Sequence, residues 1–217
     1  MANAIGYSLH NFKDLGVHTE MLTDSIVDLA EKGVITGKRK EIHTGEISCA
    51  FGWGSKKLYD FMDKNEGVRV YPTSYIADTA VVSQYKKFVS INSCLCCDLL
   101  GQVGSESLGF SQFSGTGGQL DFVRGARLAE SGKSFLCMNS TAALIDGTVV
   151  SRITAGLAPG TVVTVPRTDV QYVVTEYGYA DLNDKSVSER AEALINIAHP
   201  LFREQLRIEG KEKGIIY

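Results

Sequence analysis

Residues 16–33, GVHTEMLTDSIVDLAEKG, indicate the fold most directly. Residues 16–20 are rich in β-branched side chains and predict a short strand. The apolar spacing after Ser25 predicts a helix, which Thr23 or Asp24 can cap and Gly33 can end. Because the same order of strand, helix and strand recurs over residues 46–71, with Ser55 as a helix cap, the chain is predicted to have an α/β fold.

The remainder of the chain continues this alternation. Its predicted strands cover residues 88–99, 102–108 and 133–138 and most of 148–177, and its predicted helices cover residues 2–13 and 120–129 and two segments after residue 186. Ser186 and Glu189 form a capping box for the first of these last two helices, and Pro200 separates them. No repeat or linker is present, so residues 1–217 are counted as one domain.

Composition excludes several classes of function. The chain has 217 residues, with 22 basic and 25 acidic side chains and a net charge of -3. Without an excess of positive charge, nucleic acid is not expected as a partner. No apolar run is long enough to span a bilayer, and no secretory leader is recognisable, so we expect a cytoplasmic protein without a membrane partner.

Five cysteines are present, at positions 49, 94, 96, 97 and 137. They are odd in number and lie mostly in apolar runs, which favours buried thiols in a reducing compartment. Cys94-Leu95-Cys96-Cys97 lacks the two separated Cys-x-x-Cys pairs of a zinc site, and no histidine is near it in the sequence. We therefore expect no metal.

Glu20 ends the first predicted strand, at the edge where a parallel sheet presents side chains to a ligand. A carboxylate there is a candidate catalytic group, but a solvated residue near a helix N-terminus is an equally physical interpretation. Glu46, Glu106 and Glu176 are also acidic residues beside strands. Composition alone does not rank these four.

The second candidate feature is the loop Ser114-Gly115-Thr116-Gly117-Gly118-Gln119. Its glycines allow backbone N–H groups to approach a ligand, and the following helix directs its positive end toward an anion. The loop could hold a phosphate, a thioester oxygen or an oxyanion. It matches neither a dinucleotide fingerprint nor a P-loop, so a tight turn without a ligand stays open.

Three further features allow a structural and a functional interpretation. His18 could orient a reacting group, although a histidine in an apolar strand is more often a hydrogen-bonded core residue. Ser140 and Thr141 suit either an anion-binding turn or a helix cap. The basic run at residues 38–40 is interpreted as a solvated loop.

Taken together, six segments resemble the acetyl-CoA hydrolase/transferase family, over essentially the whole chain. They are DLGVHTEM (residues 14–21), SINS (90–93), GQV with SES (101–107), FSGTGGQ (113–119), V-TEYG (173–178) and NIAHP (196–200). Within that family, the chain is most similar to 4-hydroxybutyrate and butyrate:acetate CoA-transferases. The resemblance implies an open, mostly parallel sheet of the NagB/RpiA/CoA-transferase-like fold.

The resemblance also implies roles for individual residues. Glu20 matches the position of the family's catalytic glutamate, and Gly115, Gly117 and Gly118 match its CoA-binding loop. Leu95 falls where family members contact CoA. Coenzyme A is then a substrate, exchanged between an acyl-CoA and a short-chain carboxylate through a glutamyl-CoA thioester. Two alternatives remain, a thioester hydrolase on the same scaffold and an inactive CoA-binding fragment.

The chain departs from the family in its extent. Family enzymes have two related α/β domains, and residues 1–217 resemble the C-terminal catalytic domain alone. We therefore expect an N-terminal domain as a partner, and self-association into a homo-oligomer through the surface which that domain would cover. Cys96-Cys97 also replaces a stretch that is often acidic and apolar in relatives.

Overall fold

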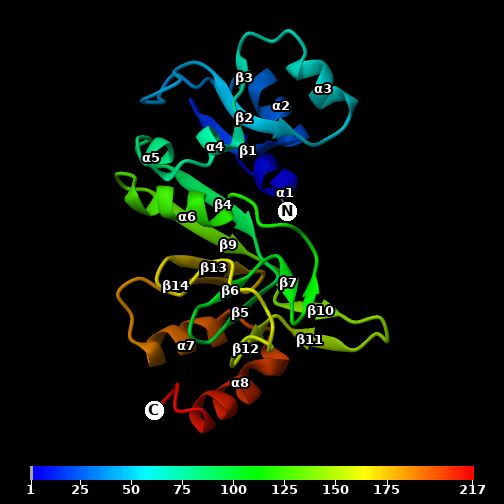
Figure 1. Ribbon diagram of the computed structural model, residues 1–217, viewed down its shortest axis with the longest axis vertical. Helices are drawn as coiled ribbons and strands as arrows, with labels where there is room; N and C mark the ends of the chain where they lie inside the picture. The colour runs from blue at the N-terminus through cyan, green and yellow to red at the C-terminus, as the bar shows by residue number, and fades with distance from the viewer. Residues whose placement is uncertain (1) are drawn as a thin grey trace. The chain divides into compact units, whose positions relative to one another are not determined.

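The computed structural model describes residues 2–217, with side chains from residue 5 onward. It comprises two compact units, one formed by the chain up to Phe88 together with Leu128–Gly132, and the other by Val89–Arg127 and Lys133–Tyr217. Each unit has a mostly parallel sheet accompanied by helices (Figure 1). The predicted α/β class is therefore confirmed.

The first unit is built on a three-stranded parallel sheet in the order β1-β2-β3. Its elements are α1 (Ala2–Tyr7), β1 (Val17–Leu22), α2 (Asp24–Glu31), β2 (Ile47–Gly52), α3 (Lys56–Met62), β3 (Val68–Val70), α4 (Thr73–Ile76) and α5 (Thr79–Val82). Helices α2 and α3 each connect neighbouring strands of this sheet. Leu22, Leu29 and Leu58 are fully buried in its core.

The predicted N-cap residues of α2 and α3 are in place, but they make different hydrogen bonds from those expected. Thr23 and Ser55 stand at the N-caps, but neither side chain makes the capping hydrogen bond. The Ser55 hydroxyl donates instead to Asp24 at 2.8 Å, and the Ser55 amide donates to the same carboxylate. Asp24 thus joins the start of α2 to the start of α3.

The second unit is built on a four-stranded sheet in the order β14-β13-β9-β4, in which only β14 is antiparallel. Its strands are β4 (Val89–Ser93), β5 (Cys96–Asp98), β6 (Val103–Gly104), β7 (Ser107–Leu108), β8 (Ser111–Gln112), β9 (Lys133–Cys137), β10 (Thr141–Ala143), β11 (Val149–Ser151), β12 (Ile153–Thr154), β13 (Tyr172–Thr175) and β14 (Gly178–Asp181). Its helices are α6 (Gln119–Leu128), α7 (Val187–Asn196) and α8 (Pro200–Glu212).

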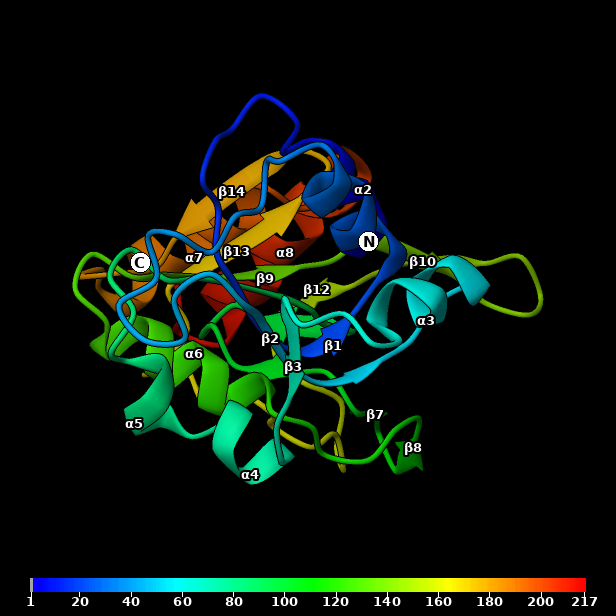
Figure 2. The ribbon, with the colours of Figure 1, turned by 90° about the horizontal axis from the view of Figure 1, so that it is seen from above.

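A single apolar core joins the sheet and helices of the second unit. Leu136 and Val173, from adjacent parallel strands, are fully buried, as are Leu194 and Ile195 on α7. Strands β5, β6 and β12 form a separate small sheet, which contributes Cys97, Val103 and Ile153 to this core. Figure 2 shows β13 and β14 with α7 and α8 nearby, in agreement with the packing of these elements.

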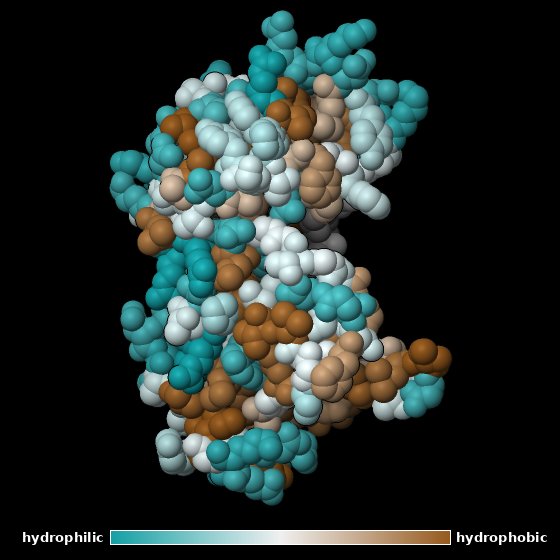
Figure 3. Space-filling view, in the orientation of Figure 1, coloured by the Kyte–Doolittle hydropathy of each residue, from teal (hydrophilic) through white to brown (hydrophobic). Residues whose placement is uncertain are grey.

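The β10–β11 hairpin projects from the second unit and is apolar at its tip (Figure 3). Ile145 is fully exposed there, and Leu144 and Val149 are half exposed. Among residues 2–217, no helix has both the length and the apolar character needed to cross a bilayer.

Several predicted boundaries are wrong, because tertiary contacts override local pattern. The apolar run 88–99 divides into β4 and β5, which belong to different sheets. The first helix ends at Tyr7 instead of residue 13, and residues 155–171 contain no strand although their composition favours one. The predicted capping box is confirmed, with Ser186 and Glu189 bonding reciprocally.

Replacing the cap tests its contribution to the second unit. Ser186→Ala leaves the first amides of α7 without their side-chain acceptor, so we expect a loss of about 1 kcal/mol in the free energy of unfolding. Urea unfolding followed by circular dichroism measures this change. Ser188→Ala, inside the same helix, is the matched control and should lower stability by much less; equal losses in both variants would contradict the assignment.

Candidate functional site

Glu20 lies on β1, two residues before the strand ends at Leu22, instead of at the end as predicted. Glu20 is partly buried. Side chains two residues apart in a strand share a face, so Glu20 projects from the same face of the sheet as His18. In the register of the sheet, His18 pairs with Ser48, and Ser48 with Arg69. Glu20 therefore lies one step further along a face that carries a row of polar side chains.

That polar face is organised around the ammonium group of Lys40, which is 8% exposed. The Lys40 Nζ atom donates to the carbonyl of Val17 at 3.0 Å, to the carbonyl of Glu46 at 2.9 Å and to the Ser48 hydroxyl at 2.9 Å. It also lies 5.5 Å from the centre of the Tyr85 ring, within cation–π range. Burial lowers the pKa of Lys40 to about 8, against the opposing attraction of Glu46.

The position of Lys40 corrects the interpretation of residues 38–40 as a solvated loop. Lys38 and Arg39 are exposed or partly exposed, but Lys40 turns inward. Gly16 makes this possible, since a Cβ atom there would stand 2.6 Å from the Lys40 Cγ atom. No pattern within the basic run distinguishes the buried lysine, because its acceptors come from β1, from β2 and from Glu46, the residue before β2.

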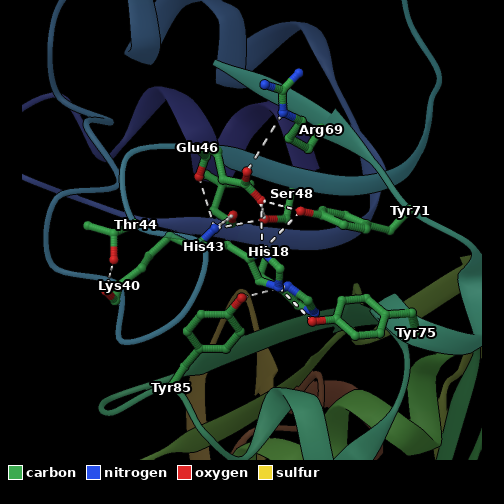
Figure 4. A network of polar contacts seen from close by, with 11 residues as sticks. His18, Lys40, His43, Thr44, Glu46, Ser48, Arg69, Tyr71, Tyr75 and Tyr85 are labelled. Atoms are coloured by element: carbon green, nitrogen blue, oxygen red, sulfur yellow. Dashed lines mark hydrogen bonds and ion pairs between the residues drawn. The ribbon is translucent and has the colours of Figure 1, made fainter. Parts of the chain in front are cut away.

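Glu46 connects this ammonium group to a cluster of aromatic side chains (Figure 4). Its Oε1 atom accepts from the Ser48 hydroxyl at 3.0 Å and from the Tyr71 hydroxyl at 2.9 Å, and lies 3.0 Å from His43 Nδ1. The other ring nitrogen of His43 is 2.7 Å from the Tyr75 hydroxyl. Glu46 is thus committed to holding β2 and the segment before it in place.

His18 is a hydrogen-bonded core residue, as the structural interpretation of the sequence predicted. Its Nε2 atom is 2.8 Å from the carbonyl of Ile76, and its Nδ1 atom is 3.0 Å from the Tyr85 hydroxyl. A carbonyl only accepts, so Nε2 carries the proton and Nδ1 accepts from Tyr85. Burial lowers the pKa of His18 to about 4, although the bond to Ile76 opposes the shift. The neutral imidazole therefore links β1 to the end of α4.

The glycine-rich loop belongs to the second unit, and Glu106 anchors it through hydrogen bonds. This glutamate is 5% exposed and accepts from Thr116 Oγ1 at 2.6 Å and from Thr164 Oγ1 at 3.1 Å. Its backbone carbonyl also accepts from the Phe113 amide at 2.8 Å. Glu106 therefore anchors the loop, a role that sequence reasoning did not assign to it.

Gly115 and Gly117 are exposed in this loop, whereas Gly118 is buried and leads into α6. A Cβ atom at Gly115 would meet no other atom within 4 Å, and the residue does not have a left-handed backbone. Neither packing against the residues that the structure describes nor a left-handed backbone thus requires glycine there. Close approach of a ligand to the loop is a remaining physical reason for it.

Leu95 lies at the same end of the second unit's sheet as this loop. It comes two residues after Ser93, the last residue of β4, and the Ser93 carbonyl accepts from the Gln119 side chain at 3.4 Å. The Leu95 amide donates to the Gly104 carbonyl at 2.9 Å. Leu95 and the start of α6, which Gly118 precedes, therefore both adjoin the carboxyl end of a parallel strand, where such sheets bind ligands.

Ser140 forms an anion-binding turn whose anion is Glu176. The carboxylate accepts from the Ser140 amide at 2.8 Å and from its hydroxyl at 2.6 Å. Burial by itself would raise the pKa of Glu176, but these hydrogen bonds outweigh it and lower the pKa. The alternative of a helix cap at Ser140 and Thr141 is wrong, because β10 follows.

The cysteines are buried free thiols. Burial raises the pKa of Cys49 to about 11 and raises that of Cys97 well above its ordinary value. These groups are therefore protonated at neutral pH. Within residues 2–217, no three His, Cys, Asp or Glu side chains are grouped to hold a metal ion.

The predicted site residues fall in both units. Glu20 belongs to the first unit, and Leu95, Gly115, Gly117 and Gly118 belong to the second. The catalytic role of Glu20 and its approach to the glycine loop stay predictions.

Comparison with known proteins identifies the relationship. The sequence model of the acetyl-CoA hydrolase/transferase C-terminal domain matches residues 54–209. The chain belongs to this family. It is 48% identical to the 4-hydroxybutyrate coenzyme A transferase of Clostridium kluyveri, over 97% of the chain and 48% of the relative. It is also 48% identical to the butyryl-CoA:acetate CoA-transferase of Anaerostipes caccae, over the whole chain and 49% of the relative.

Solved structures agree with this family assignment. RipA from Yersinia pestis superimposes with a TM-score of 0.92 at 39% identity, covering 99% of this chain and 48% of RipA. The 4-hydroxybutyrate CoA-transferase of Porphyromonas gingivalis superimposes with a TM-score of 0.82 at 40% identity, covering 98% of this chain and 49% of that enzyme. This chain thus spans about half the length of the relatives that it matches. The predicted CoA-transferase-like fold is confirmed.

The buried His18 predicts a pH dependence of stability. Between pH 6.5 and 4, the unfolded chain binds a proton at His18 that the folded chain does not, so stability falls as the pH falls through this range. At pH 4.5, the loss is roughly 2 to 3 kcal/mol. Urea unfolding at pH 7 and pH 4.5 should show a smaller acid-induced loss in His18→Gln than in the parent protein. The carboxylates common to both proteins cancel in this comparison, and identical losses would contradict the prediction.

Proposed function

We propose that this chain is the C-terminal catalytic domain, residues 1–217, of an enzyme that transfers coenzyme A between an acyl-CoA and a short-chain carboxylate. Acetate, butyrate and 4-hydroxybutyrate are the candidate acids. The observation that carries the proposal is the family match, together with 48% identity to CoA-transferases over nearly the whole chain. Glu20 on β1 supplies the carboxylate that this chemistry requires.

The reaction follows from the nucleophilicity of a carboxylate toward a thioester. Glu20 attacks the acyl carbonyl and the carbon–sulfur bond breaks. CoA is released as a thiolate, and an acyl-glutamyl anhydride is formed. The thiolate then attacks the glutamyl carbonyl and releases the acyl group as a free carboxylate. Glutamyl-CoA remains, and the incoming acid repeats both steps in reverse. The energy of the thioester is conserved provided that water does not reach either intermediate.

The glycine loop is proposed to bind CoA and to stabilise the oxygen anions that develop during these steps. Exposed Gly115 and Gly117 leave backbone N–H groups accessible, and Glu106 holds the loop through Thr116. Loss of one such donor typically costs roughly 3 to 4 kcal/mol of barrier. Gly118 and Leu95 complete the proposed CoA-binding set at this end of the sheet.

The complete enzyme is proposed to include an N-terminal domain, because the relatives are about twice as long as the region matched here. We further propose that it is a cytoplasmic homo-oligomer, that its partners are acyl-CoA and carboxylate, and that it requires no metal. Since acyl specificity depends on the whole substrate pocket, the choice among short acids is a property of the complete enzyme.

Trapping the intermediate tests the role of Glu20. Incubating the complete enzyme with butyryl-CoA, reducing with borohydride and digesting should yield a peptide containing Glu20 with its side chain reduced to an alcohol. Glu20→Gln should lose this product and at least about 10³-fold in turnover, as expected when a nucleophile is removed. Glu66→Gln, an exposed glutamate on the same unit, is the control and should retain both. A trapped glutamate elsewhere would show that Glu20 is not the nucleophile.

A thioester hydrolase is the second candidate, favoured by the more distant relationship to the acetyl-CoA hydrolase of Candida albicans, which is 28% identical over the whole chain. The two activities differ in whether a carboxylate or water resolves glutamyl-CoA. For a transferase, the rate of butyryl-CoA consumption should rise with acetate, and acetyl-CoA should form in equal amount. If free CoA forms at the same rate with and without acetate, the enzyme is a hydrolase.

A further inference from the structure

A second group of polar residues in the second unit is not used by the proposed reaction. A cavity of about 220 Å³ opens between the end of α6, the segment before β13 and the segment joining β14 to α7. Its floor includes Val170 and Leu182, both 1% exposed. Its polar lining carries four cationic side chains, from Arg127, Arg167, Lys185 and Arg190, and one acidic side chain, from Asp184.

The four cations form no ion pair with the residues that the structure describes. Among residues 2–217, none of them has a carboxylate within 4.0 Å, although seven other lysines and arginines do. Asp184 lines the same cavity without approaching any of them to that distance. A concave surface with several unpaired cations attracts anions, because the repulsion among like charges is relieved when an anion enters.

Arg190 fixes the shape of this cavity. Its guanidinium group donates to the carbonyls of Leu100 at 3.1 Å, Leu182 at 2.7 Å and Arg167 at 2.8 Å. Burial lowers the pKa of Arg190, and the positive charges of Arg167 and Arg127 also lower it, against the opposing influence of Cys97 and Asp98. Three of its five N–H groups are used in this way, and the other two make no hydrogen bond to the residues that the structure describes.

Arg127 and Arg167 both line the cavity and make few hydrogen bonds to the described residues. Among the hydrogen bonds of the described residues, Arg127 donates one, to the Thr168 carbonyl at 2.5 Å. The Arg167 side chain is exposed and makes no hydrogen bond to any residue that the structure describes, while its backbone is held by Arg190. A planar guanidinium group binds phosphate through two parallel hydrogen bonds, and a dianion neutralises more of this positive charge than a carboxylate does.

The cavity lies at the opposite end of the sheet from the glycine loop. Helix α6 begins at Gln119, beside the carboxyl end of β4, and reaches Arg127 roughly 12 Å further along its axis. Leu182 donates its amide to Gln171, just before β13 begins, so the other side of the cavity lies at the amino end of that parallel strand. The two features are separate places on the second unit.

We propose that this cavity, defined by Arg127, Arg167, Lys185 and Arg190, binds a phosphate dianion, either free or as the phosphomonoester of a nucleotide. The site does not depend on the proposed CoA transfer. Arg190 holds the segments that form the cavity through its three hydrogen bonds. Arg167 supplies a guanidinium group whose side chain makes no hydrogen bond to the residues that the structure describes.

Isothermal titration calorimetry of the 217-residue chain tests this site, with inorganic phosphate, adenosine 3′,5′-bisphosphate and acetate as separate probes in phosphate-free buffer. We expect saturable phosphate binding that weakens as sodium chloride is added. Arg167→Ala should weaken phosphate binding at least tenfold. Tighter binding of the bisphosphate, with the same dependence on Arg167, would identify a nucleotide as the source of the phosphate, and equal binding would identify free phosphate.

Arg207→Ala is the matched control, because it removes an arginine from α8 that pairs with Glu192 outside the cavity. It should leave phosphate affinity unchanged. Circular dichroism of each variant checks folding, which Arg167→Ala should preserve since that side chain holds no other residue. The proposal is wrong if phosphate gives no saturable heat, if Arg167→Ala binds it as tightly as the parent chain does, or if acetate binds equally well.

Discussion

The buried ammonium group of Lys40 is the constraint on which the first unit depends. A cation removed from water is stable only when acceptors surround it. Here those acceptors are the carbonyls of Val17 and Glu46 and the hydroxyl of Ser48, so β1, β2 and the segment before β2 have to meet around one atom. Because β1 also carries Glu20, the strand of the proposed nucleophile is positioned by a charge that the reaction itself does not use.

Hydrogen bonds give three of the four strand-associated glutamates a structural role. Glu46 holds Ser48 and Tyr71, Glu106 holds Thr116 and Thr164, and Glu176 holds Ser140. Each of these three carboxylates stabilises a loop or strand end through hydrogen bonds that a covalent role would disrupt. The proposal of Glu20 as the nucleophile rests on the family relationship and on its position on β1.

The second unit uses the two ends of its parallel sheet differently. At the carboxyl ends of the strands, the exposed glycine loop leads into the N-terminus of α6, where a partial positive charge favours an anionic ligand or transition state. At the amino ends, α6 finishes near a cavity lined by four cations, whose positive charge comes from side chains. A backbone site suits an oxygen anion that forms transiently, whereas guanidinium groups suit a stable dianion.

The sequence by itself determined the features that depend on neighbouring residues: the α/β alternation, the α7 capping box, helix α6 and the family, through motifs in a fixed order. The tertiary structure decided the rest. It places residues 88–99 in two different sheets and buries the side chain of Lys40. It also brings the Glu176 carboxylate to the hydroxyl of Ser140. Each of these outcomes depends on a partner distant in the chain, and whether a polar group is buried or solvated is determined by whether such a partner can reach it.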